Sequence, residues 1–97
     1  MPYTIVRESI RQSINDTFWD FDQAADTYFI ETYLDTGFSL GRTITYSTDE
    51  LTQYRTNVWL SIDAWITFSN DPVMSPSFAA RDQYNQDNNI YSCIPEM

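Results

Sequence analysis

Apolar and polar residues alternate in four segments of the chain, a period of two that is typical of strands with one buried face. The alternation predicts strands near residues 3–10, 38–47, 51–60 and 90–94. A polar run at residues 47–50 is expected to turn the chain between the two central strands. Pro95 is expected to end the last strand, because proline has no N–H to donate to a neighbouring strand.

Helical spacing of apolar residues separates the strands. Residues 21–35 predict a first helix, with Asp20 or Asp22 as its N-cap. Gly37 stands where a left-handed residue would end that helix. The connection between the first strand and this helix is therefore residues 11–20, which are mostly polar.

A second helical pattern falls into two pieces. Ser61 stands three residues before Ala64, the spacing at which its side chain can accept the N–H of that residue and cap a helix. Along this piece, one stripe at helical spacing is formed by Ile62, Trp65, Ile66 and Ser69, with Phe68 on its edge. Ser75 is expected to cap the second piece, with Pro76 at its first helical position.

The elements follow in the order strand, helix, strand, strand, helix, strand. This order predicts an α+β fold of the ferredoxin-like β-α-β-β-α-β type, with an antiparallel sheet, helices on one face and the second helix split. Residues 1–97 are expected to form one such domain. Trp59 and Trp65 are expected to be buried at the two ends of the turn that Ser61 caps.

The strand at residues 51–60 carries large apolar side chains on both faces, including Val58 and Trp59. A half-solvated sheet should instead alternate cleanly. The face without helices is therefore expected to be buried by another chain, in a homodimer or a larger assembly. Arg42, Arg55 and Asn57 are expected on that face, where they should meet acids or backbone groups across the interface.

Composition removes several chemistries. The chain has no His and no Lys, and Cys93 is its single cysteine. Histidine triads, histidine-ligated haem, cysteine-rich zinc sites and Schiff-base lysines therefore cannot be built. The acidic group Asp16, Asp20, Asp22 and Asp26 lacks the spacing of a calcium loop and is expected to provide caps and solvated charges. We expect no metal and no cofactor.

The formal net charge is −9. Duplex DNA carries about one negative charge per 1.7 Å, so direct binding of nucleic acid is not expected. Binding to an anionic membrane is disfavoured for the same reason, and no apolar run is long enough to span a bilayer. No signal-peptide pattern begins the chain, which favours the cytoplasm of the producing cell. The acids either solubilise the protein or mimic a nucleic acid toward a basic partner.

Two groups are candidates for protein contact. Trp19 belongs to the run Phe-Trp-Asp-Phe at residues 18–21, which forms either a core plug before a helix or an exposed anchor for a partner. Arg42 and Arg55 lie on the two central strands as cross-strand or diagonal neighbours. Because like charges directly opposite are unfavourable, carboxylates, including those of a partner subunit, are expected nearby.

Residues 55–68, Arg-Thr-Asn-Val-Trp-Leu-Ser-Ile-Asp-Ala-Trp-Ile-Thr-Phe, resemble the dimeric α/β-barrel superfamily that includes antibiotic-biosynthesis-monooxygenase-like proteins. In that superfamily a strand ends in an aromatic residue followed by Ser and a helix start with an acid and Ala. The resemblance implies sheets paired face to face. It also implies an alternative function, a small cofactor-independent oxygenase whose cavity Arg55, Asn57 and Trp59 would face.

Residues 71–72, 78–82 and 84–85 resemble the split second helix of small uncharacterised tailed-phage proteins of the cyanophage type. Together the resemblances cover residues 44–90, about half the chain. They imply a non-catalytic self-assembly module, a virion-associated structural component that contacts itself or other virion proteins. The expected interface residues are Arg42, Arg55, Asn57, Trp59 and Trp19. An enzyme of the oxygenase type and an acidic nucleic-acid mimic remain the alternatives.

Overall fold

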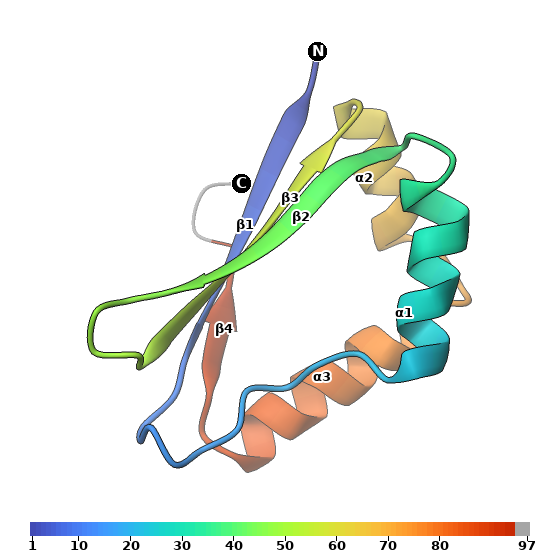
Figure 1. Cartoon of the computed structure of the whole chain (residues 1–97). Helices are drawn as coiled ribbons and strands as arrows, with labels where there is room; N and C mark the ends of the chain where they lie inside the picture. Colours follow the sequence, from blue (N-terminus) through green and yellow to red (C-terminus); the bar gives the residue numbers. More distant parts are fainter. Residues whose placement is uncertain (95–97) are drawn as a thin grey trace.

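Four antiparallel strands form one sheet in the computed structural model, which describes residues 1–94 (Figure 1). The strands are β1 (Tyr3–Ile10), β2 (Ser39–Tyr46), β3 (Thr52–Trp59) and β4 (Tyr91–Cys93). Their order across the sheet is β2-β3-β1-β4. These bounds agree closely with the expected strands, and Pro95, the expected end of the last strand, lies outside the described residues. The α+β class is therefore confirmed, with three helices beside the sheet.

The first helical region begins at Asp22, one of the two predicted caps, and ends before Gly37 as predicted, but its second half is π-helical. α1 (Gln23–Phe29) starts at Asp22, whose Oδ1 accepts the N–H of Ala25 at 2.8 Å. It continues into a wider π-helical turn, η1 (Ile30–Leu34), which the sequence pattern did not predict. Gly37 then turns the chain with φ +84°, a conformation that glycine adopts without strain.

The second helical region is split, as predicted. α2 (Ile62–Ser69) is capped by Ser61, whose Oγ accepts the N–H of Ala64 at 3.2 Å. α3 (Ser75–Asp87) starts without a side-chain cap, so the predicted cap at Ser75 is wrong. A turn through Asp71 leads into α3 instead, and the Asp71 Oδ1 accepts the N–H of Val73 at 2.8 Å.

The stripe on α2 is only partly buried. Trp65 and Phe68 pack against the core, but Ile62 and Ile66 are about half exposed, at 48% and 43%. The helix turns Ala64, 4% exposed, toward the sheet in their place. A small residue at that position lets the helix approach the strands closely, which the spacing of larger apolar residues did not indicate.

The core lies between β3 and the helices and is largely aromatic. Trp59 is 1% exposed, and its ring centroid lies 4.9 Å from Phe68 and 6.1 Å from Phe29. Because these partners come from α2 and α1, the rings fix the helix side of the sheet. The predicted burial of Trp59 is confirmed. Trp65 is partly buried at the edge of this core, so its predicted burial is confirmed only in part.

A β-bulge sets which residues of β2 face the helices. Ser39 and Gly41 pair with the successive residues Trp59 and Val58, so the register shifts at Leu40. Gly41 has φ +151°, which suits the irregular backbone of a bulge. After the shift, Arg42 is opposite Asn57, on the same face as Trp59.

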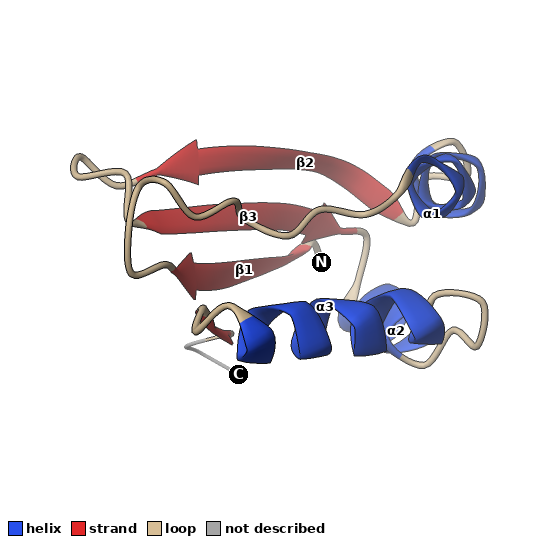
Figure 2. Ribbon diagram, turned by 90° about the horizontal axis from the view of Figure 1, so that it is seen from below, coloured by secondary structure: helices blue, strands red, loops and turns tan. Residues whose placement is uncertain are grey.

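The helices cover the sheet unevenly. Figure 2 shows α2 and α3 beside β1 and β4, with α1 beyond the end of β2. The segment of residues 11–22 crosses the sheet between them (Figure 2). The opposite face of the sheet carries residues such as Val6, Tyr54 and Val58, which none of the helices within residues 1–94 covers. None of the helices described is both long enough and apolar enough to cross a membrane.

Candidate functional site

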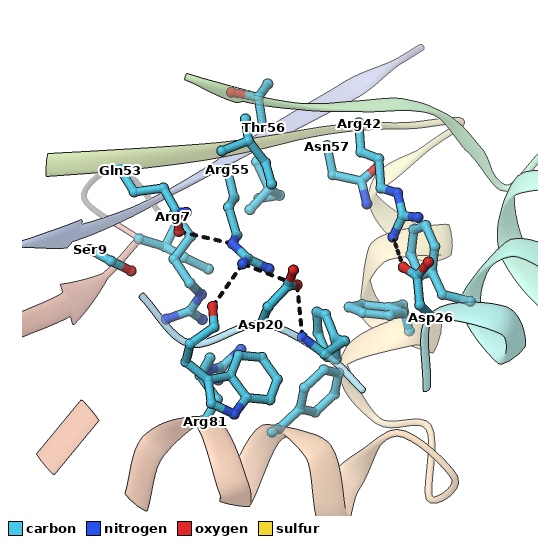
Figure 3. A pocket seen from close by; sticks show the side chains of 18 of the residues that line it. Arg7, Ser9, Asp20, Asp26, Arg42, Gln53, Arg55, Thr56, Asn57 and Arg81 are labelled. Carbon is cyan, nitrogen blue, oxygen red and sulfur yellow. Dashed lines mark hydrogen bonds and ion pairs between the residues drawn. The ribbon is translucent and has the colours of Figure 1, made fainter. Parts of the chain in front are cut away.

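A partly open cavity of about 930 Å³ lies between the sheet and the helices. Its lining comes from β1, β2 and β3, from the segment of residues 11–22, and from all three helices (Figure 3). The volume falls within the roughly 300–1,000 Å³ typical of pockets that bind small molecules. The cavity lies where α2 and α3 run beside β1 and β4 and α1 lies beyond the end of β2, so that the segment of residues 11–22 crosses the space left between them.

Arginines dominate the polar lining. Four of the five basic residues of the chain line the cavity: Arg7, Arg42, Arg55 and Arg81. Strand alternation explains the first three. Arg7 on β1 is directly opposite Arg55 on β3, and Arg42 on β2 is diagonal to Arg55. Side chains on one face of neighbouring strands lie close together, so the sheet gathers three guanidinium groups in a row.

Arg55 is held in place by three partners. Its Nη2 lies 3.2 Å from Asp20 Oδ1 and donates to the backbone oxygen of Trp19 at 2.7 Å. Its Nε donates to Gln53 Oε1 at 3.0 Å (Figure 3). The segment of residues 11–22 is thus tied to β3 through one guanidinium group, which positions the Trp19 ring at the cavity.

Arg42 closes the end of the cavity near α1. Its Nη1 lies 2.7 Å from Asp26 Oδ1 on α1, and its guanidinium lies 4.7 Å from the centre of the Phe29 ring. Asn57 beside it accepts a hydrogen bond from Ser39 Oγ at 2.7 Å. This end therefore holds a matched ion pair and a satisfied amide oxygen.

Arg7 differs from the other arginines. Among residues 1–94 it makes no ion pair, and its Nη1 donates to Ser92 Oγ at 3.3 Å. Burial, and then the positive charge of Arg81, lowers the pKa of the Arg7 guanidinium to about 10. The group still carries its charge at neutral pH. The cavity therefore contains one positive charge that no described carboxylate balances directly.

The remaining walls are aromatic. The ring centroids of Trp19 and Phe21 lie 4.7 Å apart, and Phe21 continues to Phe78 on α3 at 6.5 Å. Phe78 in turn meets Phe68 on α2 at 5.2 Å. All three tryptophans of the chain line the cavity: Trp19, Trp59 and Trp65. A ligand in this space would touch flat apolar surfaces on one side and guanidinium and amide groups on the other.

All five residues expected at a protein interface line this one cavity: Arg42, Arg55, Asn57, Trp59 and Trp19. The expected placement of Arg42, Arg55 and Asn57 on the face without helices is wrong, since they face the helices. The bulge in β2 and the register of β3 produce this difference. Carboxylates do lie near the two arginines, as predicted, and they belong to the same chain. A role of these residues in contacts between chains stays a prediction.

Sequence reasoning missed Arg7 and Arg81 as members of the site. A signal for Arg7 was available, because it alternates with Tyr3 and Ile5 on the inner face of β1. Arg81 stands three residues after Phe78, on the same side of α3. The pattern of apolar and polar residues does not reveal that β1 pairs with β3. This pairing is what places Arg7 opposite Arg55.

The arrangement is suited to binding more than to proton transfer or nucleophilic attack. The described lining has no His, Cys or Lys, and its two carboxylates, Asp20 and Asp26, are engaged by Arg55 and Arg42. Within residues 1–94 no three acidic, His or Cys side chains gather in a way that could hold a metal ion. The polar groups of the cavity are hydrogen-bond donors in excess, which favours acceptors and anions.

Comparison of the chain with protein-family models, with curated proteins and with solved structures finds no match.

Proposed function

We propose that this protein binds a small organic molecule in the cavity between its sheet and helices. The observation that carries the proposal is the cavity itself, about 930 Å³ in volume, with arginine side chains on the sheet and aromatic rings opposite. Binding sites for small molecules combine apolar walls with a few convergent polar groups. Binding here requires no metal and no cofactor.

The aromatic groups favour a flat ligand. Trp19 and Phe21 form one wall, and the sheet with Asn57 forms the other. Aromatic rings prefer offset or edge contacts with other rings, which contribute about 0.5–1.5 kcal/mol each beyond the burial of area. A planar ligand of one or two rings would satisfy both walls.

Blocking the cavity tests the proposal. Ile44 lines the cavity, and its neighbour Thr45 pairs with Tyr54 on the opposite face of the sheet. Ile44→Trp should fill part of the space, while Thr45→Trp adds the same ring outside it. Calorimetric titration with 2-naphthylmethanol should show binding to the parent and to Thr45→Trp, and at least about tenfold weaker binding to Ile44→Trp, since tenfold corresponds to about 1.4 kcal/mol. No binding to the parent, or equal loss in both variants, would contradict the proposal.

The fold is proposed to be ferredoxin-like. The strand order β2-β3-β1-β4 with all neighbours antiparallel supports this topology, because it places β3 between β1 and β2, as in a split βαβ unit. An experimental structure with a different strand order would refute it.

Self-association is a second candidate function, favoured by the sheet face that no helix covers. Tyr54 and Val58 lie on that face, and Leu60 beyond the end of β3 is 49% exposed. A homo-oligomer, or a contact with other proteins of a phage particle, would bury these side chains. The native mass of the purified protein and the proteins that co-purify with it test this candidate.

A further inference from the structure

We propose that Arg7, with Arg55 and Arg81 beside it, binds the carboxylate of a monoanionic organic ligand whose flat body lies among the aromatic rings of the cavity. This inference rests on the proposed function and adds the chemical class of the ligand. It concerns the corner of the cavity between β1, β3 and α3 (Figure 3).

The charged side chains described in this corner carry a net positive charge. Its three guanidinium groups belong to Arg7, Arg55 and Arg81, and two carboxylates pair with them. Asp20 lies 3.2 Å from Arg55, and Asp82 lies 3.1 Å from Arg81. Among residues 1–94, the three positive charges and two negative charges of this corner sum to +1, which one carboxylate would balance.

The positions of the charges matter as much as their number. The side chains of Arg55 and Arg81 are 22% and 17% exposed, whereas those of Asp20 and Asp82 are 73% and 69% exposed. The two arginine side chains are therefore largely buried at the cavity, whereas both carboxylates are largely exposed to solvent, although Asp20 also lines the cavity. Solvent screens the acids more than it screens the arginines, so the inside of the corner is positive even though the protein carries a net charge of −9.

Arg7 is the member best placed to meet a ligand. It stands directly opposite Arg55, an arrangement of like charges that costs free energy unless an anion lies between or beside them. Its single described partner is the hydroxyl of Ser92, which leaves other guanidinium N–H groups available. Burial is the main cause that lowers the pKa of Arg7, and the positive charge of Arg81 lowers it further.

Buried polar side chains complete the corner. Gln53, Ser9 and Asn85 line the cavity and are 4%, 8% and 7% exposed. Gln53 orients Arg55 through its Oε1, and Ser9 shares a hydrogen bond with Ser92, the partner of Arg7. Both strand arginines are therefore held by neighbours, so little conformational entropy would be lost when a carboxylate binds.

A matched pair of ligands and a matched pair of variants test the inference. The ligands are 2-naphthoate and 2-naphthylmethanol, which share a ring system and differ in charge. The variants are Arg7→Gln and Arg11→Gln. Each removes one positive charge and changes the formal net charge from −9 to −10, but Arg11 lies outside this cavity. Affinities are measured by calorimetry, with a thermal melt to confirm that each variant is folded.

The parent and Arg11→Gln should bind 2-naphthoate at least about tenfold more tightly than the alcohol, because hydrogen bonds to a charged group are the stronger ones. Arg7→Gln should bind both ligands with nearly equal affinity, close to that of the alcohol for the parent. A tenfold preference that survives in Arg7→Gln overturns the inference. Equal binding of both ligands to the parent also overturns it but leaves the cavity as a ligand site. No binding of either ligand contradicts the proposed function as well.

A second measurement needs no variant. The ¹H–¹⁵N resonance of the Arg7 Nε–H group should shift when acetate is titrated into the parent protein, whereas that of Arg11 should not. Acetate carries the carboxylate without the ring, so this readout follows the anion site separately from the aromatic walls. An unchanged Arg7 resonance would show that the corner does not bind a carboxylate.

Discussion

At the scale of single residues, the Asp71 side chain accepts more hydrogen bonds than any other acidic side chain among residues 1–94. It is 8% exposed, and its Oδ2 accepts hydrogen bonds from the hydroxyl groups of Tyr28, at 2.7 Å, and of Tyr33. Burial alone would raise the pKa of Asp71, but the bonds from Tyr33, Tyr28 and Val73 outweigh it and lower the pKa below its ordinary 3.8. The carboxylate therefore ties η1 and α1 to the turn between α2 and α3.

This network predicts a loss of stability in acid. A carboxyl group whose pKa is lower in the folded state contributes stability that is complete above the unfolded pKa, here about 3.8, and is lost as the pH falls through the lower folded value. Urea unfolding at a series of pH values should show this loss in the parent. Asp71→Asn should lower the free energy of unfolding at neutral pH by about 1–3 kcal/mol and show a shallower acid loss. Equal acid sensitivity in both proteins would show that another group is responsible.

Single residues were predictable where burial follows from strand alternation and unpredictable where it depends on a partner element. Trp59 lies on the inner face of β3 and was correctly expected in the core. Trp65 was expected there too, yet it packs at the edge against Tyr3, with ring centroids 6.0 Å apart. The spacing of apolar residues in α2 does not show whether Trp65 or Ala64 is the more deeply buried. Helical periodicity indicates which face is buried but not how deeply.

At the scale of elements, α2 and α3 differ in how the backbone N–H groups at their starts are hydrogen-bonded. The Ser61 side chain caps α2, and Ser61 has the extended backbone, φ −158° and ψ 169°, that an N-cap requires. α3 begins at Ser75 without a side-chain cap. In the turn before it, Asp71 accepts hydrogen bonds from the backbone N–H groups. Two serines that precede helical patterns therefore have unlike roles.

The two serines predict unlike stability effects. Ser61→Ala should lower the free energy of unfolding by about 1 kcal/mol, because the N–H of Ala64 loses its acceptor. Ser75→Ala should change it by no more than about 0.5 kcal/mol, as is usual for exposed positions. Urea unfolding of both variants under one condition gives the comparison. A cost for Ser75→Ala as large as that for Ser61→Ala would contradict the helix start described above.

The elements and their bounds could be predicted well from the sequence, but their faces could not. The strands came from alternation, which survives any sheet order. The bulge at Leu40 shifts the alternation of β2 by one residue. Ser39 and Arg42 therefore lie on the same face of the sheet, whereas a regular strand would place them on opposite faces. This bulge therefore places Arg42 on the cavity side of the sheet. The cavity itself has no sequence pattern, because it depends on where the helices meet the sheet.

At the scale of the whole molecule, charge is divided between inside and outside. The formal net charge is −9, yet four of the five arginines line the cavity. Most of the acids among residues 1–94 are exposed to solvent, around a cavity lined by four arginines and two carboxylates. Two copies of the chain should therefore repel each other at a distance, and any association must come from contacts of another kind.

Association through the open sheet face is the contact that this distribution allows. Arg42 and Arg55, once expected to form ion pairs across an interface, are engaged by Asp26 and Asp20 of their own chain. The side chains left for a partner are those of the uncovered face, among them Tyr54 and Val58. An interface of that kind should strengthen with salt, since ions screen the repulsion between copies without weakening apolar contact. An interface built on ion pairs should weaken.

Sedimentation equilibrium at micromolar protein, at about 0.1 M and about 1 M salt, where the Debye length falls from about 10 Å to about 3 Å, measures the difference. We expect a dimer that is tighter at the higher salt. Val58→Glu, which places a charge on the open face, should give a monomer, whereas Ile44→Glu adds the same charge on the cavity side and should leave the dimer intact. A dimer that weakens with salt would indicate that ion pairs hold the interface together. A monomer under every condition would leave the cavity as the site at which this protein meets its ligand, and the open face as solvated sheet.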